Sequence, residues 1–210
     1  MTDLERETEL DAPDGPPEPS SLTEKQSARR RRVLAAAMEL AEEGGYEAVQ
    51  MRDVAARADV ALGTVYRYFS SKDQLLAAVW ADWTAALERR LKGNQPLEGT
   101  TRADRVNDFL RRATRPLERK PELAAALVTS WASADPHAAG YQREVGSWMT
   151  RIVVDALDGL SPTEQQGIRE VLAHVWYSVL LGWVKGRLEA ERMHEILHAA
   201  CHLLLDPREP

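Results

Sequence analysis

The segment ALGTVYRYFSSKDQLL, residues 61–76, combines three aromatic side chains with two cations. A buried core favours aromatic residues without charges, and a solvated face favours charges without aromatic residues. A surface that binds phosphates uses both kinds, because cations neutralise the phosphates and tyrosine hydroxyls donate hydrogen bonds to them. The mixture in this segment therefore indicates a surface that binds DNA.

Several side chains in and near this segment have the chemistry to contact DNA. Thr64 can hydrogen-bond a base or touch a thymine methyl group, and Arg67 can donate to guanine or to a phosphate. Gly63 has no side chain, so its backbone can approach a duplex closely. The full set of expected DNA contacts is Arg52, Leu62, Gly63, Thr64, Tyr66, Arg67, Tyr68 and Lys72.

Two short helices at about 51–58 and 62–68, joined by a turn at 59–61, must position these side chains. Helices joined so tightly cross steeply, as in a helix-turn-helix. Burial of Val54, Ala55, Val65 and Phe69 against a preceding helix leaves the other face of the second helix free to enter the major groove of DNA. Taken singly, each aromatic residue or arginine also fits an ordinary core or solvated position, so the prediction depends on their combination.

Positive charge is concentrated beside this motif, although the chain of 210 residues carries a formal net charge of -6. Residues 1–20 contain seven acids and one arginine, whereas residues 21–72 contain nine bases and seven acids. The acidic, proline-rich segment 1–22 is predicted to be disordered. The KQSARRRR run that follows it fits either a solvated face or a surface that touches DNA.

The composition favours a reducing compartment, and we expect a cytoplasmic protein. Cys201 is the single cysteine, so no internal disulfide can form. The acidic N-terminus lacks the apolar region of a signal peptide, and the apolar stretch at 173–184 is too short to span a bilayer.

Helical periodicity runs through the rest of the chain, without a convincing strand. Gly44 and Gly45 are expected to stop the first helix near residue 43, and capping boxes are expected at 23–26 and 71–74. The pattern predicts an all-α protein with a helix-turn-helix DNA-binding domain at 23–70 and a ligand-binding and dimerisation domain at 71–210. Further helices are expected at about 72–93, 102–118, 121–133, 137–158, 162–187 and 189–205.

The helix that begins at SPTE, residues 161–164, is apolar over much more than the stripe of a surface helix. Such a helix buries one side in its own subunit and one side against a partner, unless it is wholly internal. With the last helix of the chain it predicts a four-helix dimer interface. The candidate interface residues are Val171, Val175, Tyr177, Val179, Leu181, Trp183, Ile196, Leu197 and Ala200.

The six tryptophans, against two phenylalanines, indicate a cavity. Large flat side chains on facing helices leave gaps that suit a large apolar ligand, although each tryptophan alone also fits a core. The arginines between residues 102 and 115 can hold a phosphate-bearing ligand or form a solvated face. The candidate lining residues are Phe109, Leu127, Trp131, Trp148, Met149, Ile152 and Trp176.

The HEILH segment at 194–198 matches the H-E-x-x-H pattern of zinc hydrolases, with His194 and His198 on one helical face. A catalytic zinc site needs a third protein ligand. His202 lies on the same helix, about 12 Å along it from His194, which is too far for the three rings to share one ion. We therefore expect no enzyme activity, no metal and no cofactor, and a metal-dependent hydrolase is the alternative.

The segment MRDVAARADVALGTVYRYFSSKDQLL resembles the helix-turn-helix signature of the TetR family of bacterial transcription repressors. Five residues match that signature: Val60, Gly63, Tyr66, Phe69 and Lys72. Three replace its usual glycine, serine and histidine: Asp59, Ala61 and Tyr68. Loss of the serine cap should weaken the start of the second helix by about 1 kcal/mol.

Together with GGYEAVQMR, the segment RADVALGTVYRYF is similar to the actinobacterial repressors of cholesterol and steroid catabolism, the KstR type. The resemblance implies a homodimer that binds a palindromic operator on double-stranded DNA and is released by a small molecule. In that branch the molecule is a CoA thioester of a sterol-derived acid, so an acyl-CoA or steroid derivative is the implied effector. A DNA-binding regulator without a small-molecule ligand stays open as an alternative.

Overall fold

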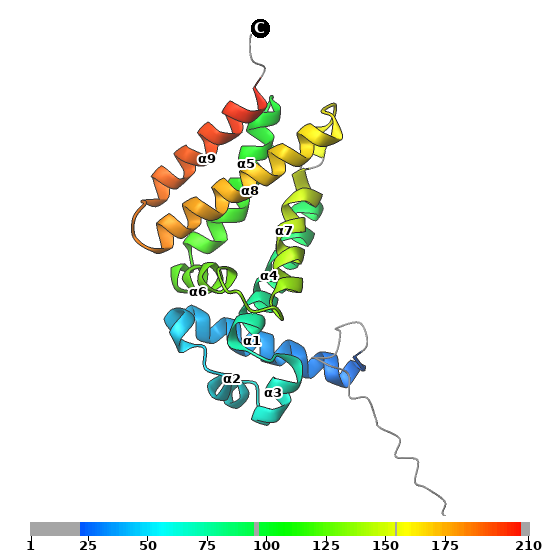
Figure 1. The fold of residues 1–210 in the computed structure, drawn as a ribbon, viewed down its shortest axis with the longest axis vertical. Helices are drawn as coiled ribbons and strands as arrows, with labels where there is room; N and C mark the ends of the chain where they lie inside the picture. Colours follow the sequence, from blue (N-terminus) through cyan, green and yellow to red (C-terminus); the bar gives the residue numbers. More distant parts are fainter. Residues whose placement is uncertain (1–21, 95–96, 154, 207–210) are drawn as a thin grey trace, which may run out of the picture.

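The computed structural model describes residues 22–94, 97–153 and 155–206. Every regular element in these residues is a helix, which confirms the all-α prediction (Figure 1). Apart from Leu22, the segment 1–22 lies outside the described residues. In chain order the elements are α1 (Glu24–Ala48), α2 (Met51–Arg57), α3 (Leu62–Tyr68), α4 (Lys72–Asn94), α5 (Arg102–Glu118), α6 (Pro121–Trp131), α7 (Ala139–Val153), the 3-10 helix η2 (Asp155–Leu157), α8 (Pro162–Val184) and α9 (Ala190–Leu205).

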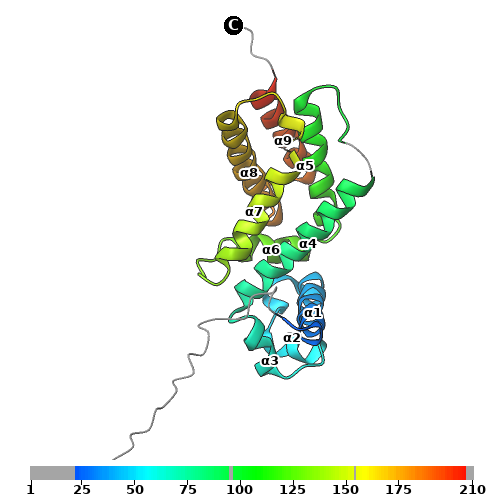
Figure 2. The ribbon, with the colours of Figure 1, turned by 90° about the vertical axis from the view of Figure 1, so that its right-hand side faces the viewer.

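The helices divide into two groups of different size. We call α1–α3 the head and α5–α9 the body. The long helix α4 leaves the head and runs beside α7 along the body, while α1 lies across α6 (Figures 1 and 2). None of the helices in the described parts of the chain is both long and apolar enough to cross a bilayer.

Helix starts follow the expected caps with one difference. The capping box at Thr23 and Gln26 is confirmed, and so is the SPTE start of α8. Before α4, the Ser71 hydroxyl accepts from the Gln74 N–H at 3.0 Å, as expected. The Gln74 side chain, however, accepts from the N–H of Ser70 at 2.6 Å. The bond from the Gln74 side chain therefore goes to the residue before the one that a standard capping box would use.

The glycine pair interrupts α1 instead of ending it. Gly44 has φ -155° and ψ 24°, and Gly45 has φ 69° and ψ -156°, after which the helix continues to Ala48. The positive φ favours glycine, and a Cβ at Gly45 would lie 3.1 Å from a carboxylate oxygen of Glu122 on α6. The predicted stop is therefore wrong by one turn, because the chain re-enters a helix after the break and so positions Tyr46.

The head has the core that the sequence predicts. Val54, Ala55, Val65 and Phe69 are all buried and join the buried face of α1. The same cluster of buried side chains continues through α6 into the body. Head and body are therefore in packing contact, and the domain boundary expected near residue 70 stays a prediction.

Candidate DNA-binding face and ligand pocket

A tight turn sets α3 against α2. Asp59 has φ 51°, a left-handed conformation in which glycine is usual and aspartate is one of the few alternatives. The Val60 N–H donates to the carbonyl of Ala55 at 3.0 Å and closes the turn. Ala61 occupies the N-cap of α3, where no side chain caps the helix. The cap is missing as the sequence predicts.

One face of α3 is open to solvent. Tyr66 is 49% exposed and Leu62 is 38% exposed. A Cβ built on Gly63 meets no heavy atom within 4 Å, so no described part of the subunit covers this stretch. The exposed members of the predicted DNA-contacting set are Arg52, Leu62, Gly63, Tyr66 and Arg67, with Thr64 half-buried beside them. Their contact with DNA stays a prediction at this point.

Tyr68 does not share that face, and the prediction that it lies there is wrong. Its side chain is only 2% exposed, with the ring 6.5 Å from that of Phe69. The physical reason is helical spacing, since residue 68 lies three positions after the buried Val65 and so falls on the inner side. The Tyr68 hydroxyl accepts a long hydrogen bond of 3.4 Å from Arg67. Tyr68 can therefore support Arg67, and the structure gives it no open path to DNA.

Lys72 stands at the start of α4 and is held by the last turn of α1. Its amine donates to the carbonyl of Tyr46 at 3.2 Å and lies 3.8 Å from the centre of the Tyr46 ring. The side chain is 22% exposed. An ammonium has three donors, so Lys72 can keep the Tyr46 contact and still reach a phosphate.

The arginine run divides between two sides of α1. Lys25, Arg29, Arg31 and Arg32 line a shallow groove on the exposed side of the helix. Arg30 faces the other way, with its guanidinium 5.3 Å from the centre of the Phe69 ring and 3.1 Å from the hydroxyl of Tyr141 on α7. Arg30 thus connects the head to the body. The other four side chains are exposed, so both interpretations of the run, a solvated face and a surface that touches DNA, stay possible for them.

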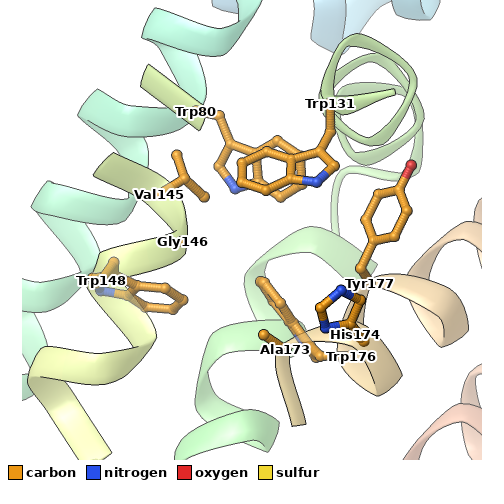
Figure 3. Close-up of a pocket in the computed structure, with 9 residues that line it drawn as sticks. All are labelled: Trp80, Trp131, Val145, Gly146, Trp148, Ala173, His174, Trp176 and Tyr177. Atoms are coloured by element: carbon orange, nitrogen blue, oxygen red, sulfur yellow. The ribbon is translucent and has the colours of Figure 1, made fainter. Parts of the chain in front are cut away.

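An aromatic pocket lies in the body where α4, α6, α7 and α8 meet (Figure 3). Its volume is about 130 Å³. Aromatic rings pack around it in pairs, with centroids 5.2 Å apart for Trp80 and Trp131 and 6.1 Å apart for Trp148 and Trp176. We call this the aromatic pocket, lined by Trp80, Trp131, Val145, Gly146, Trp148, Ala173, His174, Trp176 and Tyr177.

The structure brings together three of the expected lining residues: Trp131, Trp148 and Trp176. Phe109 and Leu127 are fully buried behind them and do not line the cavity, because helix packing covers both side chains. The side chains of Met149 and Ile152 lie outside the described residues. Sequence reasoning missed the remaining lining residues, of which Trp80 is the largest. A usable signal was the apolar spacing of Leu76, Trp80 and Leu87 on α4.

The wall of the aromatic pocket contains few polar groups. The Trp176 indole N–H donates to the Thr114 hydroxyl at 3.1 Å. His174 is exposed, and its Nδ1 lies 2.7 Å from the carbonyl of Glu170, which can only accept, so this nitrogen carries the proton. The indole nitrogens of Trp80 and Trp148 are buried and have no hydrogen-bond partner within the described part of the chain. Burial also raises the pKa of the Tyr177 hydroxyl.

A polar junction joins the pocket wall to the head. Asp73, in the first turn of α4, accepts hydrogen bonds of 2.6 Å from the hydroxyls of Tyr46 and Ser133. Burial and the bond to Asp73 raise the pKa of Tyr46 far above its usual value. The Ser71 hydroxyl donates to the carboxylate of Asp135. We call these five residues the polar junction; Ser133 and Asp135 belong to the loop that follows α6.

The loop of the polar junction begins at the aromatic pocket. Trp131 is the last residue of α6, and its ring lines the cavity. Gln142 on α7 donates to the carbonyls of Trp131 and Ser133 at 3.1 and 3.2 Å, which fixes the loop between them. A displacement of the Trp131 ring can therefore reach Asp73 and the start of α4 through two residues of backbone.

The candidate dimer residues divide into two groups. Val171 is 47% exposed, and six others are partly exposed on α8 and α9: Val175, Tyr177, Leu181, Trp183, Ile196 and Ala200. Val179 and Leu197 are buried inside the subunit, so their place in the predicted interface is wrong. They fill the seam between α8 and α9, which pack on each other. The alternative of a wholly internal α8 is also wrong.

The HEILH histidines contact side chains of α5. His194 Nε2 lies 2.5 Å from a carboxylate oxygen of Glu118, and His198 Nδ1 lies 3.4 Å from the amide of Asn107. The described residues contain no group of three His, Cys, Asp or Glu side chains that could hold a metal ion. The contacts of these histidines give the hydrolase alternative no support.

Of the arginines between residues 102 and 115, Arg102 at the start of α5 donates to the carbonyl of Asp158 at 3.0 Å.

Comparisons with known proteins agree with the helix-turn-helix geometry. Residues 33–79 match the model of bacterial regulatory proteins of the tetR family, and residues 99–204 match that of the Tetracyclin repressor-like C-terminal domain. The HTH-type transcriptional repressor KstR of Rhodococcus jostii (strain RHA1) is 40% identical over 184 residues, which cover 86% of this chain and 84% of that protein.

Two crystal structures resemble the fold. A TetR transcriptional regulator from Rhodococcus sp. RHA1 has 34% sequence identity and a TM-score of 0.79, and the match covers 89% of this chain and 100% of that chain. Thermus thermophilus FadR, a TetR-family transcriptional repressor in complex with lauroyl-CoA, has 22% identity and a TM-score of 0.67, with coverage of 86% and 97%. The second likeness is one of fold alone.

Proposed function

Because the chain belongs to the TetR family of bacterial regulatory proteins and is a KstR-like transcription repressor, we propose that an apolar small molecule in the aromatic pocket controls its binding to DNA. The protein acts as a homodimer on a palindromic operator, in the cytoplasm and without a catalytic role. The observation that carries the proposal is the polar junction, since it connects a wall of the pocket to the first turn of α4 and to the head.

DNA binding is assigned to the open face of α3. Thr64 and Arg67 read base edges, while Tyr66, Lys72 and Arg52 bind the phosphate backbone. The exposed surface around Gly63 supports this assignment, because nothing described in the subunit competes for it. Two copies of α3 must enter successive major grooves about 34–36 Å apart, which is what a palindromic operator requires.

Dimerisation is assigned to α8 and α9. Val171 and the partly exposed apolar residues of these helices form a surface that a monomer would leave in water. A two-fold axis through this surface buries the same residues of both subunits. The pairing sets the distance between the two heads, so any tilt of α4 changes that distance.

The effector is assigned to the class of acyl-CoA or steroid derivatives. Thermus thermophilus FadR, which shares the fold, binds lauroyl-CoA. The aromatic pocket, at about 130 Å³, is close to the size of an engineered apolar cavity that holds one benzene, about 150 Å³. In this conformation it takes one ring or a short chain end. The rest of a larger effector must lie at the mouth, near the exposed His174, or widen the pocket.

Release follows from the contacts of Trp131. A ligand that pushes this ring moves the end of α6, the loop with Ser133, and through Asp73 the start of α4. The ligand needs only to bind the DNA-incompetent spacing of the heads more tightly than the competent one. A thousandfold preference removes about 4 kcal/mol of operator affinity.

Genomic footprinting of the purified protein tests the proposal. We expect bound fragments to share an inverted repeat with half-sites one helical turn apart. A thermal-shift screen with acyl-CoAs and steroids should then find a compound that also reverses a band shift. Fragments with a single half-site would contradict the homodimer. A clean operator that no compound releases would favour a regulator without a small-molecule ligand.

A further inference from the structure

We propose that the acidic segment, residues 3–11, binds a basic groove on α1 of its own subunit and so competes there with the phosphates of DNA. The inference rests on the DNA binding of the chain and takes nothing from the aromatic pocket or its effector. It assigns an internal competitor to a charged surface that the fold leaves open. The basic groove is lined by Lys25, Ala28, Arg29, Arg31, Arg32 and Ala35.

The first observation is a group of cations without anionic partners. Lys25, Arg29 and Arg31 are exposed, and their side chains make no ion pair or hydrogen bond with any residue that the structure describes. Cations that share one groove repel one another, so an anion with several charges lowers their energy. The two exposed alanines add little bulk between the cations, and a chain can therefore approach the surface of the helix closely.

The second observation is the place of the groove beside the DNA-binding face. The Arg32 guanidinium donates a long hydrogen bond of 3.5 Å to the carbonyl of Asp59. Asp59 lies in the turn that sets α3 against α2. The groove thus ends next to the helix-turn-helix, where a DNA backbone that contacts α3 also passes close to α1. An anion bound in the groove would occupy the position of a phosphate.

The third observation is the pattern of the acidic segment. In the sequence DLERETELD every second residue is an acid: Asp3, Glu5, Glu7, Glu9 and Asp11. In an extended chain alternate side chains point to the same side, about 6.6 Å apart. Lys25, Arg29 and Arg32 follow one another on one face of α1, about 4.5–6 Å apart along the helix axis. Two or three carboxylates can therefore meet the three cations in order.

The length of the chain allows this contact within one subunit. Leu22 is partly buried against the core and fixes the point where the segment leaves the head, three residues before Lys25. The ten residues between Asp11 and Leu22 can extend over at most about 36 Å, and the groove from Lys25 to Arg32 is about 10.5 Å long. Between them the sequence Asp14-Gly15-Pro16 is typical of a turn, so the chain can fold back.

The tether compensates for the weakness of exposed charge pairs. Each such pair contributes little on its own and is screened by salt. A short tether, however, holds the acidic segment at an effective concentration of about 1 mM. We therefore expect the segment to occupy the groove at low salt and to leave it at about 0.5 M salt, where the screening length falls below about 5 Å.

A spin label on the acidic segment tests the contact without DNA. Thr8→Cys places a thiol between two of the acids, and the native Cys201 does not compete for the label, because it is buried and burial raises the pKa of its thiol to about 12. We expect the label to broaden the amide signals of residues 25–35 at low salt and to leave those of α9 sharp. Uniform broadening, or none on α1, would overturn the proposal.

Mixed dimers identify the subunit that supplies the segment. One subunit carries the spin label and its partner carries 15N, so only contacts between subunits broaden the signals. We expect the amides of residues 25–35 to stay sharp in this sample. Broadening as strong as in the uniformly labelled protein would mean that the segment binds the partner's groove, and the assignment to its own subunit would be wrong.

DNA affinity tests the competition. The neutral segment carries Asp3→Asn, Glu5→Gln, Glu7→Gln, Glu9→Gln and Asp11→Asn. We expect it to raise the affinity for a scrambled duplex at 50 mM salt about eightfold, since each of three exposed charge pairs is worth about twofold. The salt dependence of binding should also become steeper, because more cations are then available to phosphates. An affinity that does not change would contradict the competition.

Two backgrounds separate binding in the groove from general repulsion between the acidic segment and DNA. With Lys25→Gln and Arg29→Gln, neutralising the segment should change the affinity less than twofold. Arg89→Gln and Arg90→Gln, two exposed arginines of α4, are the matched control and should keep the full gain. An equal gain in both backgrounds would mean that the segment acts at a distance and would overturn the proposal.

These measurements also distinguish the inference from the proposed function. Broadening of the groove signals in a protein that no effector releases from DNA would leave the inference standing and remove the control by a small molecule. Release by an effector from a protein whose groove signals stay sharp would do the opposite.

Discussion

The head and the body differ in how far apart in the sequence their working residues lie. The open face of the head comes from residues 52–72, and the period of α3 decides which side chains between 62 and 68 reach solvent. The aromatic pocket draws on four helices and on residues from Trp80 to Tyr177. A recognition face is thus a property of one helix and its turn, whereas a ligand pocket depends on how distant helices pack.

The largest expected effect tests whether the head has a hydrophobic core of its own. Phe69 is fully buried there. Phe69→Ala removes the ring and leaves a cavity, and we expect the free energy of unfolding to fall by about 3–5 kcal/mol. Urea denaturation followed by circular dichroism measures the change. A loss below about 0.5 kcal/mol, the size of an ordinary surface substitution, would mean that the head does not depend on this residue.

A second test concerns the polar junction, where the two regions meet. Tyr46→Phe removes the hydroxyl that donates to Asp73, and we expect about 1–2 kcal/mol less stability at neutral pH. Because the pKa of Tyr46 is raised in the folded protein, its contribution is complete below pH about 10 and is lost as the pH rises further.

The alkaline loss of stability should therefore be smaller in Tyr46→Phe than in the wild type. Denaturation curves at pH about 8 and about 11 measure this difference. Tyr66→Phe, at an exposed position of α3, is the control. An identical alkaline loss in wild type and Tyr46→Phe would contradict the contribution of this hydroxyl.

A third test sharpens the description of the head. Lys72→Ala should weaken binding to all DNA sequences alike and lower the salt dependence by about one counterion. Thr64→Ala should instead change preference at one base step by about 1 kcal/mol. Fluorescence anisotropy with cognate and scrambled duplexes distinguishes the two effects. Tyr68→Phe keeps the buried ring and loses only the long hydrogen bond of 3.4 Å from Arg67, so its DNA affinity should stay within about threefold of the wild type. Equal losses at both duplexes for Thr64→Ala would remove it from the base-reading set.

The smallest expected effect tests whether the polar junction carries the signal from the aromatic pocket to α4. Ser133→Ala removes one hydrogen bond to Asp73. The ratio of operator affinities without and with effector should fall about threefold to tenfold, as loss of one hydrogen bond allows. Ser147→Ala, at an exposed position of α7, is the matched control. A ratio that is the same in Ser133→Ala and Ser147→Ala would mean that the signal reaches α4 by another route.

The outcomes of the sequence predictions follow the same division. The bounds of α3 and α5 were predictable because tight turns and apolar spacing are local signals. Tyr68 was misplaced because a segment that mixes aromatic residues and cations does not show which side of the helix faces the core. Val179 and Leu197 were misplaced for a related reason, since an apolar helix does not state which of its sides meets its own subunit. Trp80 was missed as a lining residue because the sequence does not show which side of α4 meets α6, α7 and α8 around the cavity.

Trp131 is part of the aromatic pocket and also stands at the start of the loop that leads to the polar junction. Its ring is part of the cavity wall, and its carbonyl is held by Gln142 beside the loop that leads to Asp73. A substitution that reshapes this wall to admit a different molecule also changes the resting position of the loop. During evolution, a shift in effector and a shift in basal operator affinity would therefore arise from the same mutation, and selection would have to correct one whenever it alters the other.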